Sequence, residues 1–173
     1  MPDAHLFLKE VIIPNDVVID ATMGNGHDTV FLASICNNVF AFDVQDAAIE
    51  KTRERLGDLK ATLIKDGHEN VDKYVQSPIK GAIFNLGYLP HSDKQVITKP
   101  NTTIMALEKI CGLLVKGGRI AITVYTGHDG GRAESDAVMG FVKTLGDGWR
   151  VDVGQARTEK APYIVCINKL CLV

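Results

Sequence analysis

The order of the secondary-structure elements is the feature that most constrains the fold. Strand-like and helix-like segments alternate regularly, which is typical of an α/β domain with a mainly parallel sheet. The last two strands, in contrast, are joined only by a short segment from about Arg157 to Pro162. That segment is too short for a crossover helix, so these two strands should form an antiparallel pair.

The expected strands cover about 17–20, 39–43, 61–65, 81–85, 119–125, 149–155 and 162–169, and the expected helices about 3–11, 28–36, 46–56, 69–75, 102–115 and 131–145. We expect Thr102 and Thr103 to cap the start of the helix at 102–115, and Gly117 and Gly118 to cap its end. These elements leave no residues over for a second domain. The sequence therefore predicts one doubly wound domain, residues 1–173, with a mainly parallel seven-stranded sheet and a C-terminal antiparallel hairpin.

Composition narrows the location of the protein and the kinds of site that it can hold. No apolar run approaches the roughly 20 residues that a membrane span needs, and no signal-peptide pattern opens the chain. The four cysteines, Cys36, Cys111, Cys166 and Cys171, form no CxxC or Cys/His cluster. We therefore expect reduced, buried thiols, no metal site, no membrane contact and a cytoplasmic protein. The net charge of −2 means that any RNA binding must rest on a local basic patch.

The segment "VVIDATMGNGHDT" predicts a ligand-binding turn. A hydrophobic strand ends at Asp20, Gly24 and Gly26 follow, and a helix begins near Asp28. Glycines let the backbone turn sharply and approach a ligand, while a helix start offers unpaired N–H groups. A tight β-to-α turn without a ligand would have the same pattern. A second acid, Asp43, ends the next strand, where a carboxylate can bind two ribose hydroxyls, and this favours a nucleoside ligand.

Two classes of cofactor compete for this turn. A dinucleotide site prefers G-x-G-x-x-G, but position 29 is Thr, and it usually needs a separate substrate domain. S-adenosylmethionine carries a sulfonium and an ammonium group, so an acid before the glycines, here Asp20, suits it better. Asp66, Gly67 and His68 follow the third strand, where the adenine of such a cofactor would lie, although Asp66-Gly67 could be a simple turn. The sequence favours S-adenosylmethionine.

Four segments carry a specific resemblance to known proteins: "DATMGNGHDTVFLA", "AFDVQ", "FNLGYLPHSDKQVITKPNTT" and "GHDGG". On these segments the chain resembles the class I S-adenosylmethionine-dependent methyltransferases, a Rossmann-like group. Within that group it resembles the small bacterial rRNA methylase family. The resemblance implies that Asn25, Asp43, Gln45 and His68 contact the cofactor. The full set of expected cofactor-binding residues is Asp20, Met23, Gly24, Asn25, Gly26, Asp28, Asp43, Gln45, Asp66, Gly67, His68 and Asn85.

The stretch "GAIFNLGYLPHSDK" predicts where the methyl acceptor binds. The spacing Asn85-x-x-Tyr88 resembles the Asn-Pro-Pro-Tyr element of amino-group methyltransferases, without its prolines. An Asn carbonyl can accept a hydrogen bond from an amine, and a Tyr ring can stack on a base. His128 could help to remove a proton. We expect Asn85, Tyr88 and His128 to be catalytic, although each could instead stabilise its own loop or sheet edge.

Five cations should lie on the rim of the sheet that is formed by the carboxyl ends of the parallel strands, where the acceptor is expected. They are Lys94, Lys99, Arg132, Arg157 and Lys160. Scattered cations are usually only solvated, but together these could contact RNA phosphates. A homodimer would widen that surface.

The resemblance implies a function as well as a fold. Members of the family are implicated in methylating the aminomethyl group on the wobble uridine of tRNA, giving 5-methylaminomethyl-2-thiouridine. We therefore expect an S-adenosylmethionine-dependent RNA methyltransferase acting on tRNA. The alternatives are a methyltransferase for rRNA or a small-molecule amine, and a non-catalytic, cofactor-binding partner subunit.

Overall fold

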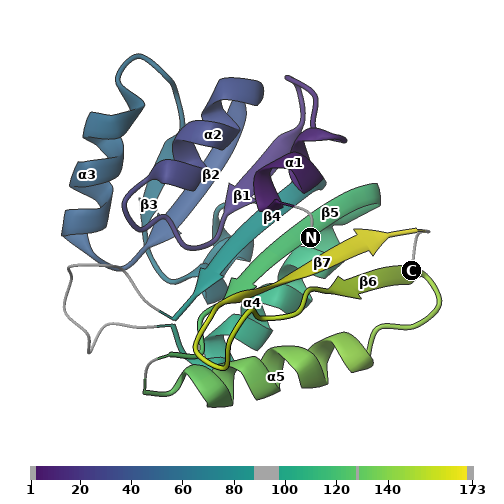
Figure 1. Ribbon diagram of the computed structural model, residues 1–173. Coiled ribbons are helices and arrows are strands. Elements are labelled where there is room, and N and C mark those ends of the chain that lie inside the picture. The colour runs from purple at the N-terminus through teal and green to yellow at the C-terminus, as the bar shows by residue number, and fades with distance from the viewer. Residues whose placement is uncertain (1–2, 88–97, 128, 171–173) are drawn as a thin grey trace.

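One seven-stranded sheet organises the protein (Figure 1). The computed structural model describes residues 3–87, 98–127 and 129–170. The strands are β1 (Val17–Asp20), β2 (Asn38–Asp43), β3 (Thr62–Lys65), β4 (Ile79–Leu86), β5 (Leu114–Val124), β6 (Trp149–Val153) and β7 (Tyr163–Lys169), in the order β3-β2-β1-β4-β5-β7-β6. Strands β1 to β5 pair in parallel, and β7 is antiparallel to both β5 and β6. The predicted doubly wound sheet with an antiparallel C-terminal pair is confirmed.

Helices cover both faces of this sheet. The helices are α1 (Ala4–Lys9), α2 (His27–Ile35), α3 (Asp46–Leu56), α4 (Pro100–Leu113) and α5 (Gly131–Lys143), with the 3₁₀ helix η1 (His68–Lys73). Figure 1 shows α1, α2 and α3 on one face and α4 and α5 on the other. Each layer has its own core, because alternate residues of a strand point to opposite faces. Val18 and Ile83 pack with α1 and α2, whereas Ile19 and Phe84 belong to the core on the α4 and α5 face.

The segment expected to be a helix at 69–75 forms the 3₁₀ helix η1 instead. Asn70 has φ −98° and ψ 15°, outside the helical region, so the backbone cannot continue the hydrogen-bond pattern of an α-helix through this residue. The Asp66 side chain also accepts hydrogen bonds from Asn70 Nδ2 (2.8 Å) and Tyr74 Oη (2.7 Å). These side-chain bonds compete with helix formation and favour a tighter turn.

Both expected caps of the helix at 102–115 are wrong. α4 begins earlier, with Lys99 as N-cap and Pro100 in its first turn, where a missing N–H costs nothing. Gly117 and Gly118 lie within β5, where the pairing with β4 shifts register between Ile79 and Gly81. Gly117 has φ +81°, so these glycines accommodate an irregularity in the strand.

Within the described ranges, no helix is long and apolar enough to cross a membrane. Cys36, Cys111 and Cys166 are buried and free, as expected. The fourth cysteine, Cys171, lies outside the described residues.

Candidate active site

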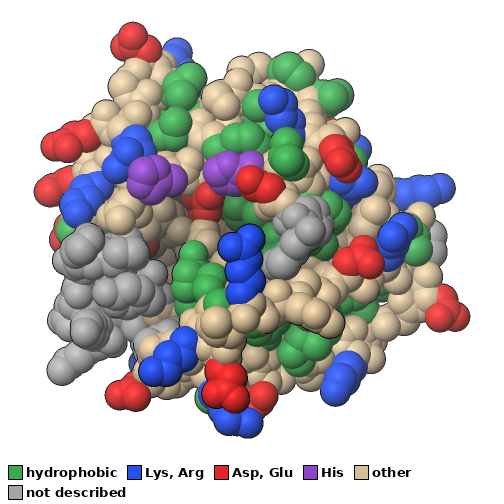
Figure 2. Space-filling view, in the orientation of Figure 1, with side chains coloured by type: hydrophobic (Ala, Val, Ile, Leu, Met, Phe, Trp, Pro, Cys, Tyr) green, Lys and Arg blue, Asp and Glu red, His purple; other side chains and the backbone are tan. Residues whose placement is uncertain are grey.

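A cavity of about 730 Å³ opens at the carboxyl ends of the parallel strands. It lies where β1 pairs with both β2 and β4, so the chain crosses from one half of the sheet to the other at this point. Ligands of open α/β sheets bind at such a switch point. The lining residues are Ala21, Thr22, Met23, Gly24, Asn25, His27, Asp28, Phe42, Asp43, Val44, Gln45, Asp66, Gly67, His68, Glu69, Asn85, Thr98, Lys99, Thr102 and Tyr125. Figure 2 shows the surface hollowed here, with acidic and histidine side chains nearby.

The glycine loop between β1 and α2 forms one wall of the cavity. Gly26 is the N-cap of α2 and has φ +89°, a conformation that favours glycine. A Cβ at Gly26 would lie 2.7 Å from Thr52 Oγ1 and 2.8 Å from Thr52 Cα, so a side chain has no room there. The Gly24 N–H donates to Asp43 Oδ2 (3.1 Å), which ties the loop to the end of β2.

Asp43 is placed to bind hydroxyl groups. Its two oxygens accept one backbone hydrogen bond each, from the N–H groups of Gly24 and Gln45 (2.9 Å for Gln45). Each carboxylate oxygen has a second lone pair available to a ligand. Burial raises the pKa of Asp43, and the backbone hydrogen bonds oppose that rise. The arrangement fits the expected role of binding a ribose.

Asp20 does not line the cavity, although we predicted it at the cofactor. It is fully buried, and its carboxylate accepts hydrogen bonds from Thr22 N–H (3.1 Å) and Thr29 Oγ1 (2.7 Å). Burial, with the nearby Asp28 carboxylate as the next cause, raises the pKa of Asp20 to about 7. Asp20 therefore stabilises the glycine loop from the side that faces away from the cavity.

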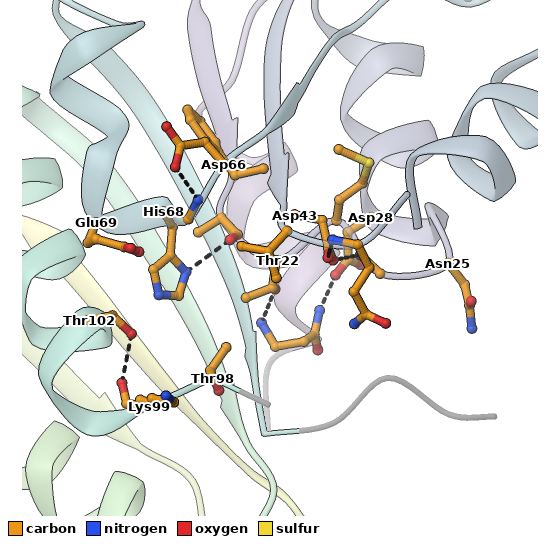
Figure 3. Close-up of a pocket in the computed structure, with 18 of the residues that line it drawn as sticks. Thr22, Asn25, Asp28, Asp43, Asp66, His68, Glu69, Thr98, Lys99 and Thr102 are labelled. Carbon is orange, nitrogen blue, oxygen red and sulfur yellow. Dashed lines mark hydrogen bonds between the residues drawn. The ribbon is translucent and has the colours of Figure 1, made fainter. Parts of the chain in front are cut away.

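The turn after β3 brings three further predicted residues, Asp66, Gly67 and His68, to the cavity (Figure 3). Asp66 accepts a hydrogen bond from the Gly67 N–H (2.7 Å), and its bond from Tyr74 Oη lowers the pKa of Asp66. His68 is buried, and burial lowers the pKa of its imidazole, which favours the neutral ring. Its Nδ1 lies 3.0 Å from the Ala21 carbonyl oxygen and must donate to it, so Nε2 is the acceptor.

Asn85 stands at the end of β4, between the cavity and the start of α2. Its backbone N–H donates to Thr22 Oγ1 (2.6 Å), and its side-chain Nδ2 donates to Asp28 Oδ2. The other oxygen of Asp28 accepts a hydrogen bond from His5 Nε2 (2.6 Å). Asp28, expected at the cofactor, thus lines the cavity and also fixes the Asn85 side chain.

The lining residues fit S-adenosylmethionine. The described part of the wall carries the acids Asp28, Asp43, Asp66 and Glu69 but a single lysine, Lys99, which suits a ligand bearing a sulfonium and an ammonium. Asn25 Oδ1 is buried with no hydrogen-bond partner among the described residues. A buried acceptor without a donor is costly, and a ligand N–H or O–H at this wall would satisfy it. The acidic lining is less favourable to the pyrophosphate of a dinucleotide.

The structure places the remaining predicted residues as follows. Tyr88, Lys94 and His128 lie outside the described residues. Lys99 lines the cavity, whereas Arg132, Arg157 and Lys160 are exposed and do not line it. Thr126 Oγ1 donates to the Glu159 carbonyl (3.1 Å), which brings the loop between β6 and β7 to the end of β5. Arg157 and Lys160 belong to that loop.

Sequence reasoning missed several lining residues. Thr22 supports Asn85, and its position between Asp20 and Gly24 was an available signal. Val44, directly after Asp43, is 52% exposed at the cavity, so it offers an apolar surface to a ligand. Thr98 accepts a hydrogen bond from the Gly87 N–H (2.8 Å) and donates to the buried Glu134 (2.5 Å). No local pattern distinguishes Thr98 from other loop threonines.

Comparison with known proteins gives consistent matches. The family model described as "Putative rRNA methylase" matches residues 39–168. The chloroplastic tRNA (mnm(5)s(2)U34)-methyltransferase of Arabidopsis thaliana is 36% identical over 155 residues, which are 80% of this chain and 57% of that protein. The chain thus spans less than two thirds of the length of this relative.

Two crystal structures are similar over nearly the whole chain. A "putative rRNA-methylase" from Clostridium thermocellum is 42% identical to this chain with a TM-score of 0.92. The match covers 98% of each chain. A "putative methyltransferase" from Streptococcus mutans, solved in complex with SAH, is 47% identical with a TM-score of 0.91, and the match covers 98% of this chain and 99% of that one.

Proposed function

Because the chain belongs to the rRNA methylase family and is a methyltransferase, we propose that it uses S-adenosylmethionine to N-methylate the 5-aminomethyl group of the tRNA wobble uridine. The product would be 5-methylaminomethyl-2-thiouridine. The Arabidopsis relative is named for a modification of this nucleoside, and the Streptococcus structure contains SAH. The observation that carries the proposal is the place of Asn85, an amide at the wall of an acidic cavity suited to a methyl donor.

Different residues of the chain would bind different parts of the cofactor. Asp43 would bind the ribose hydroxyls, and Val44 and the turn at Gly67 and His68 would enclose the adenine. The glycine loop and Asn25 would bind the amino-acid end, where Asn25 Oδ1 needs a donor. When bound, S-adenosylmethionine supplies a methyl group activated by its positive sulfur.

Asn85 would orient the acceptor amine. Its Nδ2 is engaged by Asp28, so its carbonyl oxygen is the atom left to accept an N–H bond from the amine. Such a bond directs the nitrogen lone pair away from Asn85 and fixes the amine for reaction. Positioning of this kind supplies much of the rate when the nucleophile is a neutral amine and needs no strong general base. Tyr88 and His128 remain candidates for stacking on the base and for proton removal.

We propose that the exposed cations at the rim hold the RNA. Lys99, Arg132, Arg157 and Lys160, with Lys94 outside the described residues, would contact phosphates of the anticodon stem. A homodimer would extend this surface, and the protein would act in the cytoplasm. The acidic cofactor cavity would lie inside this basic rim, so RNA and methyl donor would occupy separate electrostatic environments.

Reversing two of these charges should weaken RNA binding. In Arg157→Glu/Lys160→Glu, two lost phosphate contacts should flatten the slope of log Kobs against log salt by about 1.4 to 1.8. Fluorescence anisotropy with an anticodon stem-loop at several salt concentrations measures this slope. The matched control, Lys116→Glu/Arg150→Glu, has the same charge change near the opposite edge of the sheet and should bind almost as the wild type does. Equal binding by the two double variants would place the RNA elsewhere.

Mass spectrometry of nucleosides tests the proposed function directly. A strain lacking the gene should accumulate 5-aminomethyl-2-thiouridine in tRNA and lose its N-methylated form. The purified protein with S-adenosylmethionine should restore the methyl group on that tRNA. A methyl group missing from rRNA instead would assign the enzyme to rRNA. Unchanged tRNA and rRNA would favour a small-molecule amine or a partner-subunit role.

A further inference from the structure

A second cavity, of about 300 Å³, adjoins the candidate active site. It lies between the start of α1, the start of α2, the carboxyl ends of β4 and β5 and the start of β7. Its lining residues are Asp3, Ala4, His5, Asp28, Ile83, Asn85, Thr123, Pro162, Tyr163 and Ile164. Ligand pockets span roughly 300 to 1,000 Å³, so this one suits a small group such as a single base. Asp28 and Asn85 line both cavities and therefore form the wall between them.

The direction of the Asn85 amide at this wall is fixed by its partner. An ionised carboxylate can only accept hydrogen bonds, so Asn85 must turn its Nδ2 toward Asp28. The carbonyl oxygen then faces away from Asp28. Among the described residues, none donates a hydrogen bond to that oxygen. The wall thus presents a fixed acceptor, unpaired within the described residues, to a ligand that carries an N–H group.

His5 is the direct side-chain partner of Asp28 from α1, and the two form an ion pair when the ring is protonated. Its Nε2 is 2.6 Å from Asp28 Oδ1, and its ring is stacked on Phe31 with centroids 3.9 Å apart and planes within 1°. The hydrogen bond to Asp28 raises the pKa of His5, and burial opposes that rise. The other ionisable groups that face this pair are Asp3 beside His5, the buried Asp20, and Tyr125, whose pKa is raised mainly by burial. When its ring is protonated, His5 is the cation that faces Asp28 within this group.

We propose that the second cavity receives the aminomethylated pyrimidine base, and that His5 and Asp28 are positioning residues for Asn85. This proposal rests on the function proposed above and names the place of its acceptor. Asn85 Oδ1 accepts an N–H bond from the amine, after the amine has lost a proton to solvent. The nitrogen lone pair then forms the C–N bond while the C–S bond breaks, and that electron pair stays on sulfur. The product ammonium releases its extra proton to water.

Filling the second cavity tests whether the base binds there. Thr123 lines the second cavity and not the first, so Thr123→Phe should obstruct the acceptor alone. We expect kcat/KM for tRNA to fall at least tenfold, while the thermal shift caused by S-adenosylmethionine stays as in the wild type. Ile13→Phe introduces the same side chain at a position that is 61% exposed and lines neither cavity, and it should keep wild-type activity. A Thr123→Phe protein with wild-type kcat/KM would overturn the proposal.

Variants of His5 test the positioning role through the pH profile. The raised pKa extends the pH range over which His5 is charged, and that charge is lost as pH rises through the folded-state pKa. Wild-type kcat should therefore fall on the alkaline side. His5→Lys should move this fall to higher pH, because lysine keeps its charge longer. His5→Gln should lower kcat and lack the fall, with KM for S-adenosylmethionine unchanged.

A structural role for His5 would give a different result. If His5 had only a structural role, His5→Lys and His5→Gln would both be less active, but their kcat would still fall at the same alkaline pH as in the wild type. That result would refute the positioning role. Arg150→Gln, which removes a cation from an exposed ion pair with Asp152, should leave activity and profile unchanged. If the wild type methylates another nucleoside, the proposed function fails. If the wild type methylates the expected nucleoside and Thr123→Phe does so equally well, only the proposal that the base binds in the second cavity is refuted.

Discussion

Asp43→Ala should abolish the thermal stabilisation that S-adenosylmethionine gives the wild-type protein. The change removes the two oxygens available to a ribose and also the acceptor that holds the Gly24 N–H of the glycine loop. A ligand at 100 times its Kd stabilises a protein by about 2.7 kcal/mol. For a domain of this size that corresponds to a rise in Tm of about 5 to 10 °C. Differential scanning fluorimetry with and without the cofactor measures the shift.

Two further variants separate binding from general damage. Asp152→Ala removes an exposed carboxylate on β6, outside the cavity, and should keep the full shift. Asp43→Asn keeps one oxygen acceptor and should give an intermediate shift. A full shift in Asp43→Ala would contradict the ribose-binding role, and no shift in the wild type would contradict cofactor binding altogether.

The fold could be predicted from the sequence because its determinants are local. Apolar strand segments, the intervening amphipathic helices and the short connection before Pro162 each act within a few residues. Once the strands are parallel, their carboxyl ends meet at one edge, so Asp43, Asn85 and His68 were expected near one another. The structure brings all three to the same cavity.

The rest of the site depends on contacts between distant segments. Asp20 is the last residue of a strand as predicted, but its hydrogen bond to Thr29 turns its carboxylate inward, away from the cavity. The bonds from His5 to Asp28 and from Asn85 to Asp28 join α1, α2 and β4. No sequence pattern fixes such a side-chain arrangement, because it exists only after the two layers pack on the sheet. The same holds for the second cavity.

Asn85→Ala should separate catalysis from cofactor binding. The backbone N–H of residue 85 can still donate to Thr22, so the end of β4 should keep its shape. The carbonyl that would orient the amine is lost. Removal of one preorganised oxyanion-hole hydrogen bond lowers kcat by about 10²- to 10³-fold, and we expect a loss of about this size here. Single-turnover assays with tRNA bearing the aminomethyl nucleoside measure the rate. The cofactor-induced rise in Tm should persist, because Asp43 and the glycine loop are unchanged.

The choice of substitution at position 85 also tests which atom acts. Asn85→Asp keeps the shape of the side chain but sets a second carboxylate against Asp28, in place of the amide that donates to it. The resulting repulsion should turn the side chain out of position, so this variant should be nearly as slow as Asn85→Ala. Asn37→Ala, an exposed site outside both cavities, should react at the wild-type rate. Wild-type turnover in Asn85→Ala would remove Asn85 from the transfer step. A loss of the cofactor shift together with turnover would instead make Asn85 a residue for cofactor binding.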